Sequence, residues 1–239
     1  MSADGPLKVV LCWHMHQPNY CNSATGTYEL PWTYLHAIKD YVDMAEIIKA
    51  HPEARAVVNF APILVEQIVD YADQVRAFLD NGTAIHDPLL NALDTPALPT
   101  KQSDRLQLIN ACLRVNRERL IDPFPPYRQL ADMAGWLQDN PEALVYIDEQ
   151  YLIDILVWYH LAWLGETVRR QEPRAQELLE KGRGFNVHDR RRLMELIGEL
   201  LDGVIGRYRE LADNGQVELS MTPYAHPIMP LLLDFESAR

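Results

Sequence analysis

Residues 7–18 read LKVVLCWHMHQP and join a short apolar run to a pair of histidines. The run from Leu7 to Trp13 is rich in valine and leucine, and it lies between Pro6 and a polar cluster. Such a run is typical of a buried strand of a parallel sheet. A helix is predicted next, because apolar residues recur at spacings of three and four along residues 34–48 and the pattern ends before Pro52.

The strand and helix pattern then recurs. Residues 56–60 predict a second strand, and residues 64–78 predict a second helix that ends at Asn81-Gly82. From Thr83 to Asp213 we find no strand pattern. The periodicity there predicts helices over residues 89–110, 126–137, 142–164 and 193–211.

A third strand is predicted after Asn214-Gly215, because apolar and polar residues alternate from Val217 to Thr222. Strands that alternate with helices favour an α/β fold with a parallel sheet or barrel. Three strands cannot close a barrel, and the third would leave an unpaired edge. We therefore expect part of a (β/α) barrel: two βα units in residues 1–82, a helical insertion in residues 83–213, and a third strand with its following loop in residues 214–239.

Composition narrows the possible partners. The formal net charge of -12 argues against nucleic acid, since a nucleic-acid binder needs a basic face. No stretch has ~18 consecutive apolar residues, so no membrane span is expected. Cys12, Cys21 and Cys112 lack metal-binding spacing, which favours reduced thiols in the cytoplasm. The sequence gives no indication of the oligomeric state.

Two histidines follow the first predicted strand. Because strand side chains alternate, His14 and His16 point to the same side. Active sites of parallel α/β barrels form at this end of the strands. Two imidazoles and the Gln17 carboxamide could bind sugar hydroxyls, polarise an oxygen or hold a metal. The alternative is a pair of histidines that only cap a loop.

The third strand carries a second polar group. Glu218, Ser220 and Thr222 share a face, and they would line a barrel interior if the apolar residues met the helices. A buried carboxylate at Glu218 would need a partner, such as a histidine of the neighbouring strand. The alternative is that Glu218 faces solvent on an edge strand.

Tyr224 and His226 follow this strand and are flanked by prolines that stiffen the loop. An aromatic ring beside a histidine suits a pyranose, because its C–H face stacks on aromatics while its hydroxyls bind polar groups. Taken alone, this motif fits a rigid turn equally well. Its value comes from its position at the same end of the sheet as His14 and His16.

Three ordered segments resemble glycoside hydrolase family 57: residues 11–18, residues 57–67 and residues 215–228. The resemblance implies a distorted, seven-stranded (β/α) barrel that acts on α-glucans with retention of configuration and without a cofactor. Members include α-amylases, 4-α-glucanotransferases, branching enzymes and amylopullulanases. The implied partner is therefore an α-glucan or a maltooligosaccharide.

The resemblance also implies which residues bind the substrate: His14, His16, Gln17, Glu218, Tyr224 and His226. Retaining chemistry needs two carboxyl groups ~5–5.5 Å apart. In the family these are a nucleophilic glutamate on the fourth strand and an acid/base aspartate on the seventh, and both are expected beyond Arg239. We therefore expect an N-terminal portion of such an enzyme that is inactive alone. Four glutamates of this chain are better explained by salt bridges or solvated faces than by a catalytic role: Glu29, Glu66, Glu149 and Glu166.

Two alternatives remain at this point. His14, His16 and His226 could form a three-histidine zinc site that activates water, with Glu218 as the general base. Against this, no acidic residue adjoins the first two histidines at a usual ligand spacing. The chain could instead be a glucan-binding module that has no catalytic role.

Overall fold

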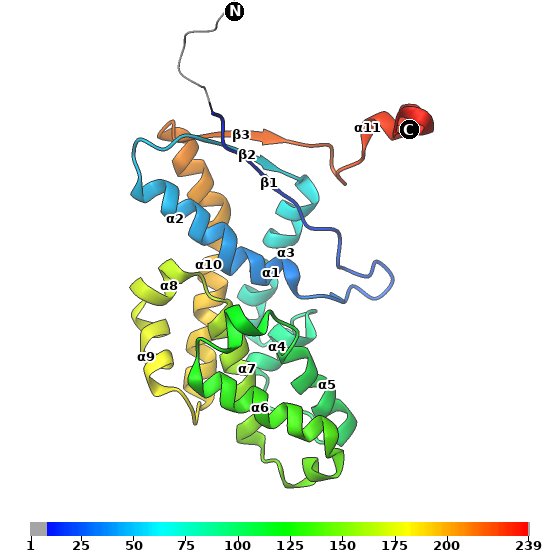
Figure 1. Cartoon of the computed structure of the whole chain (residues 1–239), viewed down its shortest axis with the longest axis vertical. Helices are drawn as coiled ribbons and strands as arrows, with labels where there is room; N and C mark the ends of the chain where they lie inside the picture. The colour runs from blue at the N-terminus through cyan, green and yellow to red at the C-terminus, as the bar shows by residue number, and fades with distance from the viewer. Residues whose placement is uncertain (1–8, 239) are drawn as a thin grey trace, which may run out of the picture.

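The computed structural model describes residues 9–238, and Figure 1 shows a parallel sheet above layers of helices. The strands are β1 (Cys12–Met15), β2 (Ala56–Phe60) and β3 (Val217–Met221), with β2 in the middle. Both neighbouring pairs are parallel. This arrangement confirms the predicted α/β class and its three parallel strands. Whether residues 1–82, 83–213 and 214–239 are separate regions stays a prediction.

The rest of the described chain is helix and loop. The helical segments are α1 (Trp32–His36), η1 (Ala37–Tyr41), α2 (Val42–Ala50), α3 (Pro62–Asn81), α4 (Pro88–Asp94), α5 (Gln102–Cys112), η2 (Arg117–Ile121), α6 (Pro125–Asp139), η3 (Pro141–Tyr146), α7 (Glu149–Trp163), α8 (Glu166–Gln171), α9 (Pro173–Lys181), α10 (Val187–Asp213), α11 (Met229–Leu233) and η4 (Phe235–Ala238). None of these helices is both long and apolar enough to cross a bilayer.

One face of the sheet packs on helices and the other is open. Ala56 and Val58 of β2 are buried, and the Phe60 ring lies edge-on to Tyr208 of α10 at 5.1 Å. Cys12 and His14 of β1 belong to the opposite, exposed face. Figure 1 shows α2, α3 and α10 on the same side of the sheet. The polar side chains of the strands therefore face away from the helical layer.

The helix ends follow capping patterns that can be recognised in the sequence. Gly82 and Gly215 have φ values of 76° and 70°, the left-handed conformation in which glycine ends a helix. The two Asn-Gly helix stops are thus confirmed. At its start, α10 has a capping box in which Asn186 and Asp189 bond each other's backbone N–H groups. The helix then runs from the lower helices up to the sheet (Figure 1).

The first strand differs from its prediction. Leu7 and Lys8 lie outside the described residues, and the ladder begins only at Cys12 and runs through Met15. The ladder has four pairs, because β1 is in register with Val57–Phe60 of β2, while Ala56, the first residue of β2, pairs with Val217 of β3. Val9, Val10 and Leu11 are exposed, so this strand is not buried as expected.

Two further expectations are corrected. Leu219 and Met221 are 46% and 72% exposed, and only Val217 of the apolar side of β3 is buried. The reason is that β3 is an edge strand in the described chain, and of its apolar residues Val217 is the one that packs in the core. The predicted helix over residues 89–110 is interrupted between α4 and α5, where Pro96 and Pro99 remove backbone donors.

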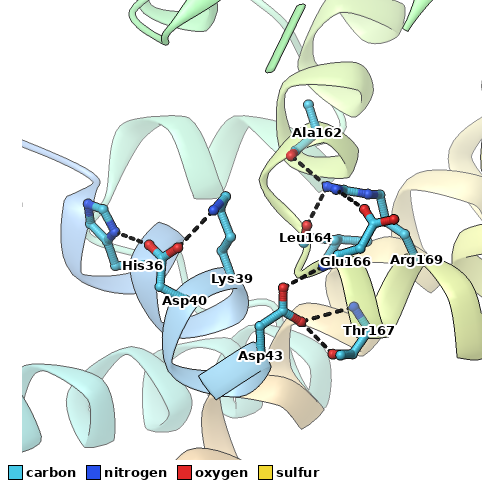
Figure 2. Close-up of polar contacts among 9 residues, drawn as sticks. All are labelled: His36, Lys39, Asp40, Asp43, Ala162, Leu164, Glu166, Thr167 and Arg169. Atoms are coloured by element: carbon cyan, nitrogen blue, oxygen red, sulfur yellow. Dashed lines mark hydrogen bonds and ion pairs between the residues drawn. The ribbon is translucent and has the colours of Figure 1, made fainter. Parts of the chain in front are cut away.

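A carboxylate joins the helix after β1 to the helical layer (Figure 2). Asp43 of α2 accepts hydrogen bonds from the backbone N–H groups of Glu166 and Thr167 at 2.6 and 3.0 Å, which caps the start of α8. A Cβ at Gly165 would lie 2.4 Å from the Asp43 carboxylate, so the close approach requires glycine. Arg169 donates to the Ala162 and Leu164 carbonyls at the end of α7.

Candidate functional site

Side chains of all three strands form one polar ladder on the open face of the sheet. His14, Asn59 and Ser220 lie in register. The His14 Nδ1 atom is 2.7 Å from Asn59 Oδ1, and Asn59 Nδ2 donates to Ser220 Oγ at 2.8 Å. The amide oxygen can only accept, so Nδ1 of His14 carries the hydrogen. In the neutral ring, Nε2 is then an acceptor that faces away from the ladder.

Three imidazole rings gather at the carboxyl ends of β1 and β3. The ring of His226 lies 4.5 Å from that of His14 and 4.7 Å from that of His16, and the last two rings are 5.8 Å apart. We call these residues the histidine cluster. Burial lowers the pKa of His16, and the neighbouring His226 and His14 lower it further. The His16 ring therefore stays neutral at pH 7, able to donate one hydrogen bond and accept another.

The loop after β3 holds His226 in an uncommon conformation. Its φ of 53° is in the left-handed region, which residues other than glycine adopt rarely. The His226 N–H donates to the Pro223 carbonyl at 2.9 Å, closing a tight turn. The prolines before and after this turn restrict the loop. The turn brings the His226 side chain back onto His14 of β1 and onto His16, which follows the strand.

Gln17 continues from the cluster into the connection between β1 and α1. Its Oε1 accepts a hydrogen bond from Tyr20 Oη at 2.8 Å. Beneath this connection lies Gln67 of α3, which is 4% exposed. Gln67 donates to the Pro18 carbonyl at 3.0 Å and accepts from the Tyr20 N–H at 3.1 Å. The segment that carries Gln17 is thus fixed to α3 by side-chain bonds.

Tyr224 is anchored to the start of α3. Its hydroxyl donates to the Glu66 carboxylate, and its carbonyl accepts from the Ile63 N–H at 3.2 Å. The hydrogen bond to Glu66 raises the pKa of Tyr224. The ring itself is 55% exposed, so one face is free to contact a ligand. In the same loop, the Thr222 hydroxyl is buried and has no hydrogen-bond partner within residues 9–238.

Glu218 does not join the histidine cluster. It lies in register with Val57, two positions nearer the start of the strands than the row of His14. Its side chain is exposed, and the described residues offer it neither an ion pair nor a hydrogen bond. It lines an open cavity of about 430 Å³, beside Arg55. The expected pairing of a buried Glu218 with a histidine is therefore not seen, because the open face leaves the carboxylate in solvent.

The three histidines that the zinc hypothesis needs are adjacent, but their rings lie stacked or tilted against one another. A zinc site instead needs ring nitrogens that converge on one point ~2.0–2.1 Å away. Across residues 9–238, no group of three or more histidine, cysteine, aspartate or glutamate side chains is arranged to hold a metal ion. Glu218, the proposed general base, lies away from these rings.

Sequence reasoning missed three residues that shape this site: Asn59, Glu66 and Gln67. The sequence gives one indication that Asn59 belongs to the site, because it is a polar residue near the end of an apolar strand. Glu66 and Gln67 gave none, since both fit a solvated helix face. Their roles depend on which loops lie against α3, and the sequence does not state that.

Comparison with known proteins gives one family. Residues 10–239 match the sequence model described as Glycosyl hydrolase family 57. No curated protein and no solved structure matches the chain.

Proposed function

The chain belongs to glycosyl hydrolase family 57, and from this premise we propose that it processes α-glucans as part of a retaining hydrolase or transglycosidase. The substrate is an α-glucan or a maltooligosaccharide, and the activity is of the amylase or glucanotransferase type. One observation supports this most: three imidazoles from two segments far apart in sequence gather at the carboxyl edge of a parallel sheet. Active sites of barrel enzymes form at that edge.

The six candidate residues bind the sugar in this proposal. His14 presents Nε2 as an acceptor because Asn59 holds Nδ1, and the neutral His16 ring offers both a donor and an acceptor. The exposed Tyr224 ring supplies a surface on which a pyranose can stack. His226 and Gln17 bind hydroxyls on either side, and Glu218 binds a hydroxyl of a neighbouring sugar. Family membership and the convergence of the histidines support these roles.

None of the six acts as nucleophile or acid/base. Retaining hydrolysis needs two carboxyl groups ~5–5.5 Å apart. The Glu66 carboxylate accepts the hydrogen bond of Tyr224, and Glu218 lies near the start of β3, away from the end that carries the histidines. We propose that the sheet belongs to a seven-stranded barrel whose further strands carry the catalytic pair, with residues 83–213 as an insertion. The exposure of Leu219 and Met221 along β3 supports this. A cytoplasmic location stays a prediction.

Calorimetric titration tests the proposal. We expect maltoheptaose to bind the chain with a saturable heat, and at least about tenfold more tightly than cellohexaose, because a curved α-1,4 chain and a straight β-1,4 chain present different hydroxyls to the same donors. We also expect the maltoheptaose to be recovered unchanged. Equal affinity for both sugars, or no binding of either, would contradict the α-glucan assignment. Release of shorter or longer maltooligosaccharides by this chain would contradict the absence of a catalytic pair.

A further inference from the structure

A second pocket lies apart from the histidine cluster, between the start of α1 and helices α4, α5 and α7. Its volume is about 150 Å³. A cavity of ~150 Å³ holds a molecule of the size of benzene; a glucosyl ring is larger, so it would fill this pocket and project from its open side. The wall is mainly apolar, and the residues that matter for the argument are Tyr28, Pro31, Trp32, Leu89, Arg114 and Tyr159.

Tyr159 carries a hydroxyl that the fold leaves unused. The residue is 0% exposed, and the hydroxyl has no hydrogen-bond partner within residues 9–238. Other buried tyrosines are paired: Tyr71 donates to Asp87 at 2.8 Å, and Tyr151 donates to the Leu130 carbonyl at 2.9 Å. A buried polar group without a partner destabilises the fold. Tyr159 lines the pocket, so a small shift of the side chains that cover the hydroxyl would let a ligand supply the missing partner.

Two groups at this pocket can still donate a hydrogen bond: the Tyr159 hydroxyl and the Arg114 guanidinium. Burial raises the pKa of Tyr159, Cys112 and Asp87 raise it further, and Arg114 lowers it, so the phenol remains protonated. Asp87 is fully engaged, because it accepts from two backbone N–H groups of α4 and from Tyr71. Arg114 is exposed in the loop just after α5, and its guanidinium has no hydrogen bond or ion pair in the described part of the chain. Tyr159 and Arg114 can therefore both bind an oxygen-rich ligand.

We propose that this pocket is a second carbohydrate site, which holds one glucosyl unit. The apolar wall at Trp32 and Pro31 contacts the C–H face of the ring, while Tyr159 and Arg114 bind hydroxyls at its edge. The inference rests on the proposed function, because that function supplies the chemistry of the ligand.

The pocket is connected to the histidine cluster by one ordered stretch of chain. The connection from β1 to α1 begins at Gln17 and ends at Trp32. Gln67 holds its first part, and the Tyr28 hydroxyl donates to Asp70 of α3 at 2.7 Å. Helix α3 therefore positions both ends of this connection. This arrangement suits a protein that binds one glucan chain through more than one of its sugar units.

Titration with maltose, followed by nuclear magnetic resonance of the tryptophan indole N–H groups, tests the proposal. The Trp32 signal is identified by its loss in Trp32→Phe. We expect this signal to shift on addition of maltose. Tyr159→Phe and Arg114→Gln should each weaken the response about fivefold, the loss expected for one hydrogen bond.

The matched control is Tyr151→Phe, on the same helix. It removes a hydroxyl that has a partner, so Tm should fall and maltose binding should not change. Tyr159→Phe should show the reverse, with Tm unchanged or higher, because it removes an unpaired hydroxyl.

The imidazole signals of the histidine cluster provide the second readout. If maltose shifts these signals but not that of Trp32, the second site is wrong and the proposed function stands. Binding at Trp32 that Tyr159→Phe and Arg114→Gln leave intact would also overturn the second site. If neither group of signals responds to maltose or to maltoheptaose, both proposals fail.

Discussion

Replacing His16 with alanine is expected to weaken maltoheptaose binding about thirtyfold, or ~2 kcal/mol, while Tm changes by less than about 2 °C. The neutral ring can make two hydrogen bonds to sugar hydroxyls, each contributing about 1 kcal/mol. The ring is only partly buried and lies beside the rings of His14 and His226, so we expect little packing to be lost. Isothermal calorimetry measures the first quantity and scanning calorimetry the second.

The control for this variant is His188→Ala, which removes an exposed histidine at the start of α10. It should change neither quantity. The pH profile adds a second criterion. Because the pKa of His16 is lowered, its acceptor is retained at neutral pH, and affinity should fall only below pH ~6.5. A parallel loss of Tm and affinity in His16→Ala would instead mark the residue as structural.

The second large effect concerns acid stability. His160 lies at 0% exposure in α7, where Nδ1 donates to the Leu156 carbonyl at 2.8 Å and Nε2 lies 3.0 Å from the Tyr34 hydroxyl. Burial lowers its pKa to about 4. The unfolded chain, with a histidine pKa near ~6.5, binds a proton first as pH falls. The folded state is therefore destabilised between pH 6.5 and pH 4.

The size of this destabilisation follows from the lowering of the His160 pKa. Between pH 7.5 and pH 4, His160 should remove about 3 kcal/mol from the free energy of unfolding. His160→Gln can keep one donor and one acceptor but does not titrate. The wild-type profile, measured by urea unfolding, should thus fall by about 3 kcal/mol more than that of the variant. The carboxylates titrate alike in the wild type and in the variant, so their contribution cancels in the difference between the two profiles. His188→Gln serves as the control, and parallel profiles of wild type and His160→Gln would contradict the assignment.

Local patterns were enough to predict much of the fold. The apolar run at residues 56–60 and the alternation from Val217 correspond to β2 and β3 because turn residues bound both segments. Gly82 and Gly215 end helices because only glycine adopts their backbone conformation easily. The meeting of His14 and His226 was also predictable, since parallel strands align their carboxyl ends.

Features that depend on the order of elements in space could not be predicted. Nothing in the sequence states that β2 is the central strand, and Asn59 bridges His14 and Ser220 only for that reason. The bond from Tyr224 to Glu66 depends on how the last loop returns to α3. The π-helical segment η1 between α1 and α2 could not be predicted either, because residues 34–48 show one continuous helical period.

The central claim is that the histidine cluster contacts the glucan, and the imidazole resonances test it most directly. On titration with maltoheptaose, we predict that the ring signals of His14, His16 and His226 shift together with one dissociation constant. The signals of the buried His160 and the exposed His188 should stay in place. Saturable calorimetric binding of maltoheptaose that leaves all three cluster signals unmoved would contradict the account.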